Sequence, residues 1–305
     1  MYKKEIMISC GVSLLLSALV ILSGIKISIS WAYLIVIIVS IMMNQIESKF
    51  TCMAYVMPTI FIIDEVFVLS GLKSHYFNLA YVEMILLVGI LHCIEGILTL
   101  SYGGNRNWAI MTYRGKKVAG GYQAYGKWLI PLLLFSINGI YIPIVAAVVY
   151  SNASFVLTPR AKARIMGSWI FVYGLVIIVI GYLTSLGDLP LLFSMISMPI
   201  LHEILFAIDT HIEQGELLYP YPKQGIRVMD FKGAVPSRIG KMDIEKGDII
   251  LKINESRVNT EEEYRAVLIN KNMKLVLQKL SGAITVVQYT YEELEEMKLV
   301  FLPPI

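Results

Sequence analysis

The chain has 305 residues, of which 56% are hydrophobic and 16% are charged, and its formal net charge is +3. An ordinary soluble domain carries about a quarter charged residues, so this composition excludes that class. Together with a mean hydropathy of +0.66 it indicates a membrane protein. Residues 1–206 hold 13 basic and 8 acidic residues, whereas residues 207–305 hold 13 and 15. We therefore expect two chemically different parts that join near residue 207.

Six apolar stretches predict membrane-spanning helices, because each approaches the roughly 20 apolar residues that a span needs. They cover residues 6–25, 29–46, 51–70, 79–100, 169–186 and 189–208. The first follows a basic start, but it is longer than the apolar core of a signal peptide and no small-residue cleavage site follows it, so we interpret it as a helix. The three cysteines, Cys10, Cys52 and Cys93, lie inside apolar stretches without CxxC spacing. This pattern predicts small buried residues, with no disulfide and no metal site.

Between the fourth and fifth of these spans, WAIMTYRGKKVAGGY at 108–122 predicts a β-hairpin with RGKK at its turn. Residues 128–157 then form an apolar stretch too long for one straight span, and Asn138, Gly139 and Pro143 would break a helix in its middle. We expect broken helices here, either a re-entrant pair or two short helices.

Charge predicts the topology, because Lys and Arg gather in cytoplasmic loops. The segments 101–127 and 158–164 contain basic residues and no acid, so we expect both in the cytoplasm. The stretch between them then enters and leaves on the same side, and the C-terminal part faces the cytoplasm. The alternative is a single helix at 128–150, which would export the C-terminal part.

From residue 223 the pattern changes to that of a small α/β domain after a linker at 209–222. Strands are predicted at 225–231 and 249–254, and 274–280 and 283–291 predict a hairpin. Thr260 caps a predicted helix at 261–269, where three acids favour the N-terminal dipole. The tail 292–305 ends in KLVFLPPI. It predicts either a packed closing segment or a peptide that occupies this domain's own binding groove.

The phrase GAVPSRIGKMDIEKGDIILKINESRV at 233–258 resembles bacterial PDZ domains. Together with the predicted spans, the resemblance gives the expected fold class, an α-helical polytopic membrane domain at 1–208 followed by a small α/β PDZ-like domain at 223–291. It also implies that an extended peptide pairs with the strand edge at 226–230, beside the helix, while backbone N–H groups at 223–226 meet a carboxylate. The alternative is a structural cap without a ligand. The expected peptide-binding residues are Lys223, Gln224, Gly225, Ile226, Val228, Tyr264, Val267 and Leu268.

Ionisable residues inside predicted spans are candidates for function. His202 and Glu203 begin HEILF, which differs from the zinc motif HExxH because Phe206 takes the second histidine's place. His92 and Glu95 share a helix face, as a buried pair or as part of a proton or ion path. No nucleotide-binding or hydrolase motif occurs.

The segments HCIEGILTLSYGG at 92–104, RGKKVAGGYQAYGKWLIPL at 114–132 and LHE at 201–203, together with the C-terminal module, resemble the MinJ-like membrane proteins of Gram-positive bacteria. The resemblance implies a non-enzymatic scaffold in the bacterial cell membrane, without cofactor, whose partners are DivIVA-like and MinD-like proteins. Membrane lipid and a second copy of the chain are further expected partners, and nucleic acid is not. The alternatives are an intramembrane metalloprotease or its inactive relative, and a small-solute transporter.

Overall fold

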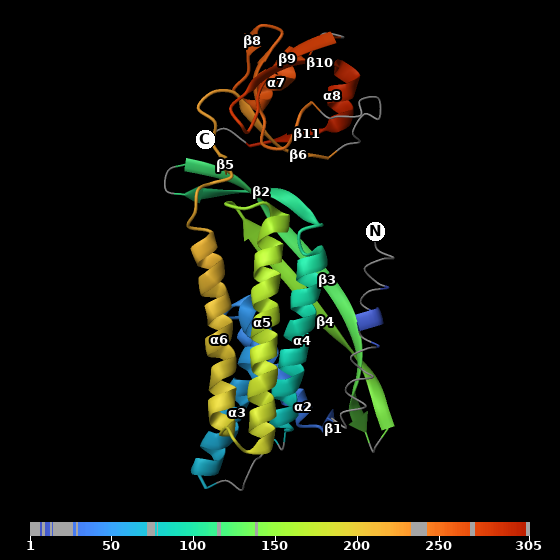
Figure 1. The fold of residues 1–305 in the computed structure, drawn as a ribbon, viewed down its shortest axis with the longest axis vertical. Coiled ribbons are helices and arrows are strands. Elements are labelled where there is room, and N and C mark those ends of the chain that lie inside the picture. The colour runs from blue at the N-terminus through green and yellow to red at the C-terminus, as the bar shows by residue number, and fades with distance from the viewer. Residues whose placement is uncertain are drawn as a thin grey trace. The chain divides into compact units, whose positions relative to one another are not determined.

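The computed structural model describes residues 7, 10–12, 14, 27–28, 30–71, 77, 79–114, 117–137, 140–232, 243–268 and 272–302. Most of the first predicted span, the segment 233–242 of the PDZ-like phrase, and Asn138 and Gly139 lie outside these residues. Two compact units make up the chain (Figure 1). The helical unit comprises Met1–Gly104, Tyr125–Tyr150 and Ala163–His211, and the C-terminal unit comprises Asn105–Ala124, Ser151–Lys162 and Ile212–Ile305. This division differs from the predicted boundaries at 208, 222 and 291, because two internal segments group with the C-terminal residues.

The helices follow the predicted apolar stretches, with different lengths. They are α2 (Tyr33–Asn44), the 3-10 helix η1 (Ser48–Thr51), α3 (Met53–Leu69), α4 (Tyr81–Tyr102), α5 (Pro159–Leu186) and α6 (Leu191–Ile212). Among the described residues, α4, α5 and α6 are long and apolar enough to cross a membrane, whereas α2 and α3 have only 12 and 17 residues. Helix α5 starts at Pro159, ten residues before the predicted start at residue 169. Proline is favoured at the first position of a helix, because the N–H that it lacks would have no partner within the helix there.

Apolar side chains cover the outward faces of these helices. Val179 on α5 and Ile200 on α6 are each 56% exposed. Large exposed apolar faces are unfavourable in water, and lipid accommodates them. The helical unit is therefore compatible with membrane association.

The predicted fold class is wrong. The described residues form eight helices, of which only three could span a membrane, and two large sheets occupy much of the chain. An α-helical polytopic domain followed by a small PDZ-like domain does not fit this arrangement.

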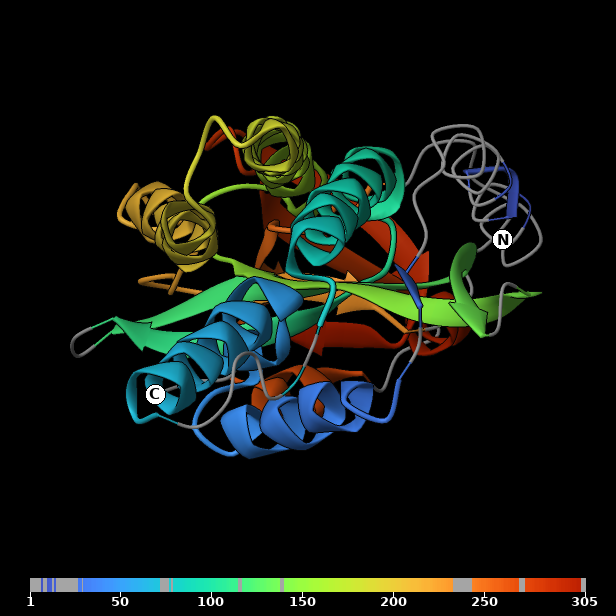
Figure 2. The ribbon, with the colours of Figure 1, turned by 90° about the horizontal axis from the view of Figure 1, so that it is seen from below.

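The main error lies in the stretch 128–157, where residues 128–137 and 140–154 form strands and broken helices were expected. The first sheet contains β1 (Ile27–Ser28), β2 (Asn107–Arg114), β3 (Lys117–Ile137), β4 (Ile140–Ser154) and β5 (Tyr219–Pro220). Strand β2 pairs antiparallel with β3 from Asn107–Ala124 to Arg114–Lys117, so the predicted hairpin is confirmed. Strand β4 also pairs with β3. Strand β1 pairs with β3 in parallel. Figure 2 shows the long strands passing between α4 and α5 on one side and α2 on the other.

Residue type explains why this stretch is extended. From Ile140 to Tyr150 it is rich in β-branched and aromatic residues, which favour strands over helices. Along β3, Trp128, Ile130 and Leu132 are buried while the residues between them are exposed. This alternation with a period of two is the pattern of a strand that buries one face.

Glycines allow α4 and α5 to approach closely. A Cβ on Gly174 would lie 2.6 Å from the Cys93 amide nitrogen and 2.7 Å from the Gly89 carbonyl oxygen. Seven residues away on each helix, a Cβ on Gly167 would lie 3.0 Å from the Gly96 carbonyl oxygen. Small residues permit such backbone contact between helices in membranes. Because Gly89 meets Gly174 and Gly96 meets Gly167, the two helices run antiparallel.

The second sheet belongs to the C-terminal unit and has the strand order β10-β9-β7-β6-β11, with β8 paired to β7. Its elements are β6 (Ile226–Phe231), β7 (Ile249–Ile253), β8 (Ser256–Arg257), α7 (Glu261–Val267), β9 (Asn272–Gln278), β10 (Ile284–Thr290), α8 (Tyr291–Met297) and β11 (Leu299–Phe301). The predicted hairpin of β9 and β10 is confirmed. The predicted cap is also confirmed, since the Thr260 side chain accepts a hydrogen bond from the Glu263 amide at 3.1 Å.

The hairpin of β2 and β3 packs against this second sheet. Val118 and Tyr122 form a buried cluster with Tyr219, Met229 and Leu302. The Tyr122 hydroxyl donates to the Met229 carbonyl, and β5 pairs with β3 at Ala119 and Gly120. These contacts explain why residues 105–124 group with the C-terminal unit.

Candidate functional site

The polar residues predicted inside the membrane come from α4 and α6. His92 is 6% exposed, and its Nδ1 lies 2.8 Å from the Val88 carbonyl oxygen. Its Nε2 lies 3.5 Å from the Cys52 Sγ, at the N-cap of α3. A carbonyl oxygen only accepts, so Nδ1 carries the hydrogen and Nε2 keeps its lone pair.

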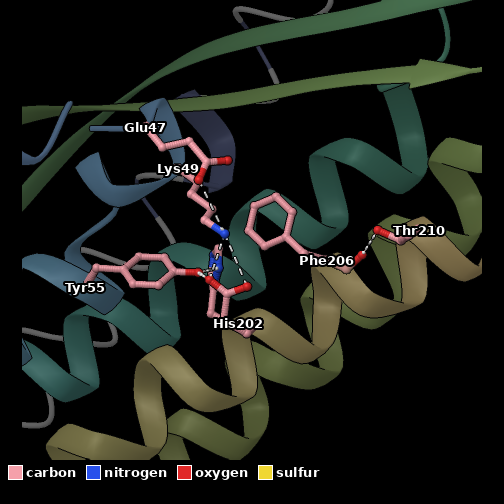
Figure 3. A network of polar contacts seen from close by, with 7 residues as sticks. Glu47, Lys49, Tyr55, His202, Phe206 and Thr210 are labelled. Carbon is pink, nitrogen blue, oxygen red and sulfur yellow. Dashed lines mark hydrogen bonds and ion pairs between the residues drawn. The ribbon is translucent and has the colours of Figure 1, made fainter. Parts of the chain in front are cut away.

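His202 belongs to a chain of polar contacts that extends to Lys49 (Figure 3). The Tyr55 hydroxyl donates to Glu203 Oε1 at 2.9 Å and lies 3.0 Å from His202 Nδ1. Lys49 Nζ lies 3.0 Å from Glu203 Oε1 and donates to Glu203 Oε2 at 3.3 Å. This hydrogen bond from Lys49 to Glu203 raises the pKa of Lys49, which lies between α2 and α3. The Tyr55 hydroxyl has one hydrogen, which Glu203 takes, so its oxygen accepts from His202 Nδ1 and leaves Nε2 with its lone pair.

Aromatic rings surround both histidines. The Tyr173 ring lies edge-on to His92 at 4.8 Å and to His202 at 5.4 Å between centroids. The two histidine rings are themselves 5.4 Å apart. Cys52, His92 and His202 each place one metal-binding atom within 4.8 Å of the other two.

The sequence suggested a hydrogen-bonded pair of His92 and Glu95. In the part of the chain that the structure describes, this hydrogen bond does not form, and His92 contacts Val88 and Cys52 instead. In HEILF, the Phe206 ring packs on His202 with a centroid distance of 5.4 Å, and Lys49 lies over the Phe206 ring. Glu203 thus joins an ion pair at a position where a protease of this motif would have its general base.

The residues predicted to bind a peptide divide between core and surface. Ile226, Val228 and Tyr264 are 1%, 0% and 5% exposed and belong to the main hydrophobic core, against which Val267 and Leu268 pack. Lys223 and Gln224 are exposed. The amide of Gly225, predicted to meet a carboxylate, donates to the Asn259 side chain at 3.0 Å. Gly225 has a φ of +84°, which glycine adopts without strain.

The strand that was expected to be an open edge lies inside the sheet. Strand β6 pairs with β7 on one side and with β11 on the other. Among the described residues, β11 forms the edge of the sheet on this side, and β10 forms the opposite edge. The Phe301 ring of β11 lies 4.7 Å from the Tyr264 ring of α7.

Two residues of β11 turn their backbone groups outward. The Lys232 amide donates to the Lys298 carbonyl at 3.1 Å, and Leu299 pairs with Phe231. In an antiparallel ladder this pattern directs the N–H and C=O of Leu299 away from β6. The Leu302 amide donates to Arg227, which turns Phe301 outward in the same way.

Sequence reasoning missed Cys52, Tyr55 and Lys49 as partners of the histidines, and it missed β11 as the edge strand. For the metal-binding atoms no local signal exists, because Cys52 precedes His92 by 40 residues and a further 110 separate His92 from His202. Before β11 a local signal marked only the preceding helix, since Thr290 and Glu293 form a capping box that starts α8.

No family model, curated protein or solved structure matches this chain.

Proposed function

We propose that this protein is a membrane-anchored adaptor that binds an extended segment of a partner protein along β11. The observation that carries the proposal is the open edge of β11, where Leu299 and Phe301 direct backbone donors and acceptors outward beside α7. Strand addition uses such groups for affinity and the neighbouring side chains for selectivity.

The resemblance to MinJ-like proteins supplies the biological setting of the proposal. The partners are then DivIVA-like and MinD-like proteins, and the task is the placement of the division site or of a cell pole. The protein would reside in the bacterial cell membrane with its C-terminal unit in the cytoplasm. The antiparallel contact of α4 and α5 supports this topology, because the basic segments after α4 and at the start of α5 then face the same side.

The test uses the full chain in lipid nanodiscs, with the DivIVA-like and MinD-like proteins of the same genome as ligands. Leu299→Pro removes the outward N–H, and proline is tolerated at an edge where that N–H faces away from the ladder. We expect affinity to fall by about five- to tenfold, because a net backbone hydrogen bond is worth about 1 kcal/mol and the ring obstructs the incoming strand.

Val286→Pro is the matched control at the opposite edge of the same sheet. The Lys279 amide donates to the Ala283 carbonyl, so Ile284 and Val286 of β10 turn their backbone groups outward as Leu299 does. Reduced binding by Leu299→Pro together with unchanged binding by Val286→Pro would assign the partner to β11. Loss in that control alone would move the site to β10, and full binding by both folded variants would refute strand addition.

A further inference from the structure

The cluster of Cys52, His92 and His202 has the composition of a transition-metal site. It comprises one thiol and two imidazoles, contributed by the start of α3, by α4 and by α6 within the helical unit. Thiolate and imidazole are the ligands that zinc prefers, and three protein ligands with one open position occur in many zinc sites.

The distances suit a single ion. With Zn–S near 2.3 Å and Zn–N near 2.0–2.1 Å, a tetrahedral ion places sulfur and nitrogen ligands about 3.6 Å apart. Cys52 Sγ and His92 Nε2 are 3.5 Å apart, and no pair in the cluster exceeds 4.8 Å. Two imidazoles on one such ion have ring centroids about 5 Å apart, and those of His92 and His202 are 5.4 Å apart. Small side-chain rotations would bring all three ligands into range.

An independent observation is the orientation of the two rings. Histidines that bind a metal usually donate their other N–H to a carbonyl, carboxylate or similar acceptor, which fixes the tautomer. His92 donates to the Val88 carbonyl, and His202 donates to the Tyr55 hydroxyl. That hydroxyl donates in turn to Glu203, which is paired with Lys49. Both rings therefore keep Nε2 as the basic nitrogen before any ion arrives.

We propose that Cys52, His92 and His202 bind one Zn²⁺ ion that ties α3, α4 and α6 together. The ion would be enclosed by the aromatic rings of Tyr55 and Tyr173. This site goes beyond the proposed partner binding at β11 and does not depend on it.

The test measures zinc on the full chain in nanodiscs after removal of metal with a chelator and reloading with ZnCl₂. We expect one zinc per chain in the wild type and in the controls Cys93→Ala and His211→Gln, which replace the same residue types on α4 and α6 outside the cluster. Cys52→Ser, His92→Gln and His202→Gln should lose stoichiometric zinc. Equal zinc in Cys52→Ser and in the wild type would overturn the proposal.

Two further measurements cover the case that a ligand variant fails to fold. Co²⁺ added to the wild type should produce a thiolate-to-metal charge-transfer band in the near ultraviolet, and absence of that band would overturn the proposal. Tyr55→Phe keeps all three ligands but removes the partner of His202, so zinc affinity should fall by about 10–100-fold. Partner binding at β11 by the zinc-free variants distinguishes a failure of this proposal from a failure of the adaptor proposal.

Discussion

The close contact of α4 and α5 predicts that Gly174→Ala destabilises the helical unit. The added Cβ would lie 2.6 Å from the Cys93 amide nitrogen and 2.7 Å from the Gly89 carbonyl oxygen. Both are backbone atoms of α4, so no side-chain rotation can relieve the clash, and the helices must separate by about 1 Å to reach normal contact. Overpacking of this kind costs about 1–3 kcal/mol.

Helix propensity acts in the opposite direction, because alanine is about 1 kcal/mol more favourable than glycine in a helix interior. We therefore expect a net loss of about 1–2 kcal/mol in the free energy of unfolding. A second substitution at Gly96, whose Cβ would lie 2.6 Å from the Phe171 amide nitrogen, should cost less in the double variant than alone, since the helices have already separated.

The assay is reversible unfolding of the full chain in mixed micelles, titrated with a denaturing detergent and followed by circular dichroism. Gly181→Ala is the matched control on the same helix, because the atoms nearest to its Cβ belong to the side chains of Leu86 and Ile85, at 2.9 and 3.1 Å, and not to the backbone. That variant should equal the wild type or exceed it slightly. If Gly174→Ala is as stable as Gly181→Ala, the backbone contact does not limit the packing and the reasoning fails.

Two further predictions concern buried and charged groups. Arg227 in β6 is 6% exposed and donates to the carbonyls of Pro220 and Gly247, at 3.0 and 2.6 Å, and burial lowers the pKa of its guanidinium. Arg227→Met leaves both carbonyls without this donor and should cost about 1–3 kcal/mol of unfolding free energy, whereas an unchanged midpoint in denaturant would contradict that role. The hydrogen bond to Glu203 raises the pKa of Lys49, so its stabilising effect is fully present below its unfolded pKa of about 10.4 and is lost as the pH rises through the higher folded value. The difference in stability between the wild type and Lys49→Met should therefore stay constant between about pH 7 and 9 and shrink only above about pH 10; a difference that disappears by pH 8 would show that another group is responsible.

Local patterns were sufficient for several elements. The apolar run at 79–100 predicted α4 within two residues at each end, and Thr260 with the acids that follow it predicted the start of α7. The hairpins around RGKK and Ser281–Gly282 also followed from short signals. Such elements are predictable because their cause lies within a few neighbouring residues: a cap, a turn dipeptide or a run of one polarity.

The stretch 128–157 shows where the same approach failed. Hydrophobicity indicated membrane depth, where backbone hydrogen bonds must be satisfied within the protein, and broken helices were inferred from the length and the helix-breaking residues of the stretch. The strands β3 and β4 satisfy these bonds through each other and through β1 and β2, which no window of one segment can reveal. The β-branched and aromatic residues from Ile140 onward were the one local signal that favoured a strand over a helix.

The sequence by itself determined that this is an apolar chain, compatible with membrane association, with an α/β part near its end, because composition and periodicity are properties of the chain alone. Tertiary structure decided which residues meet. It brought Cys52, His92 and His202 within 4.8 Å of one another from three separate helices, and it placed β11 on the edge of β6, which buried the strand expected to bind a peptide. Both outcomes depend on contacts between segments distant in sequence, and the free energy of such contacts comes from packing and hydrogen bonds that exist only once the whole chain has folded.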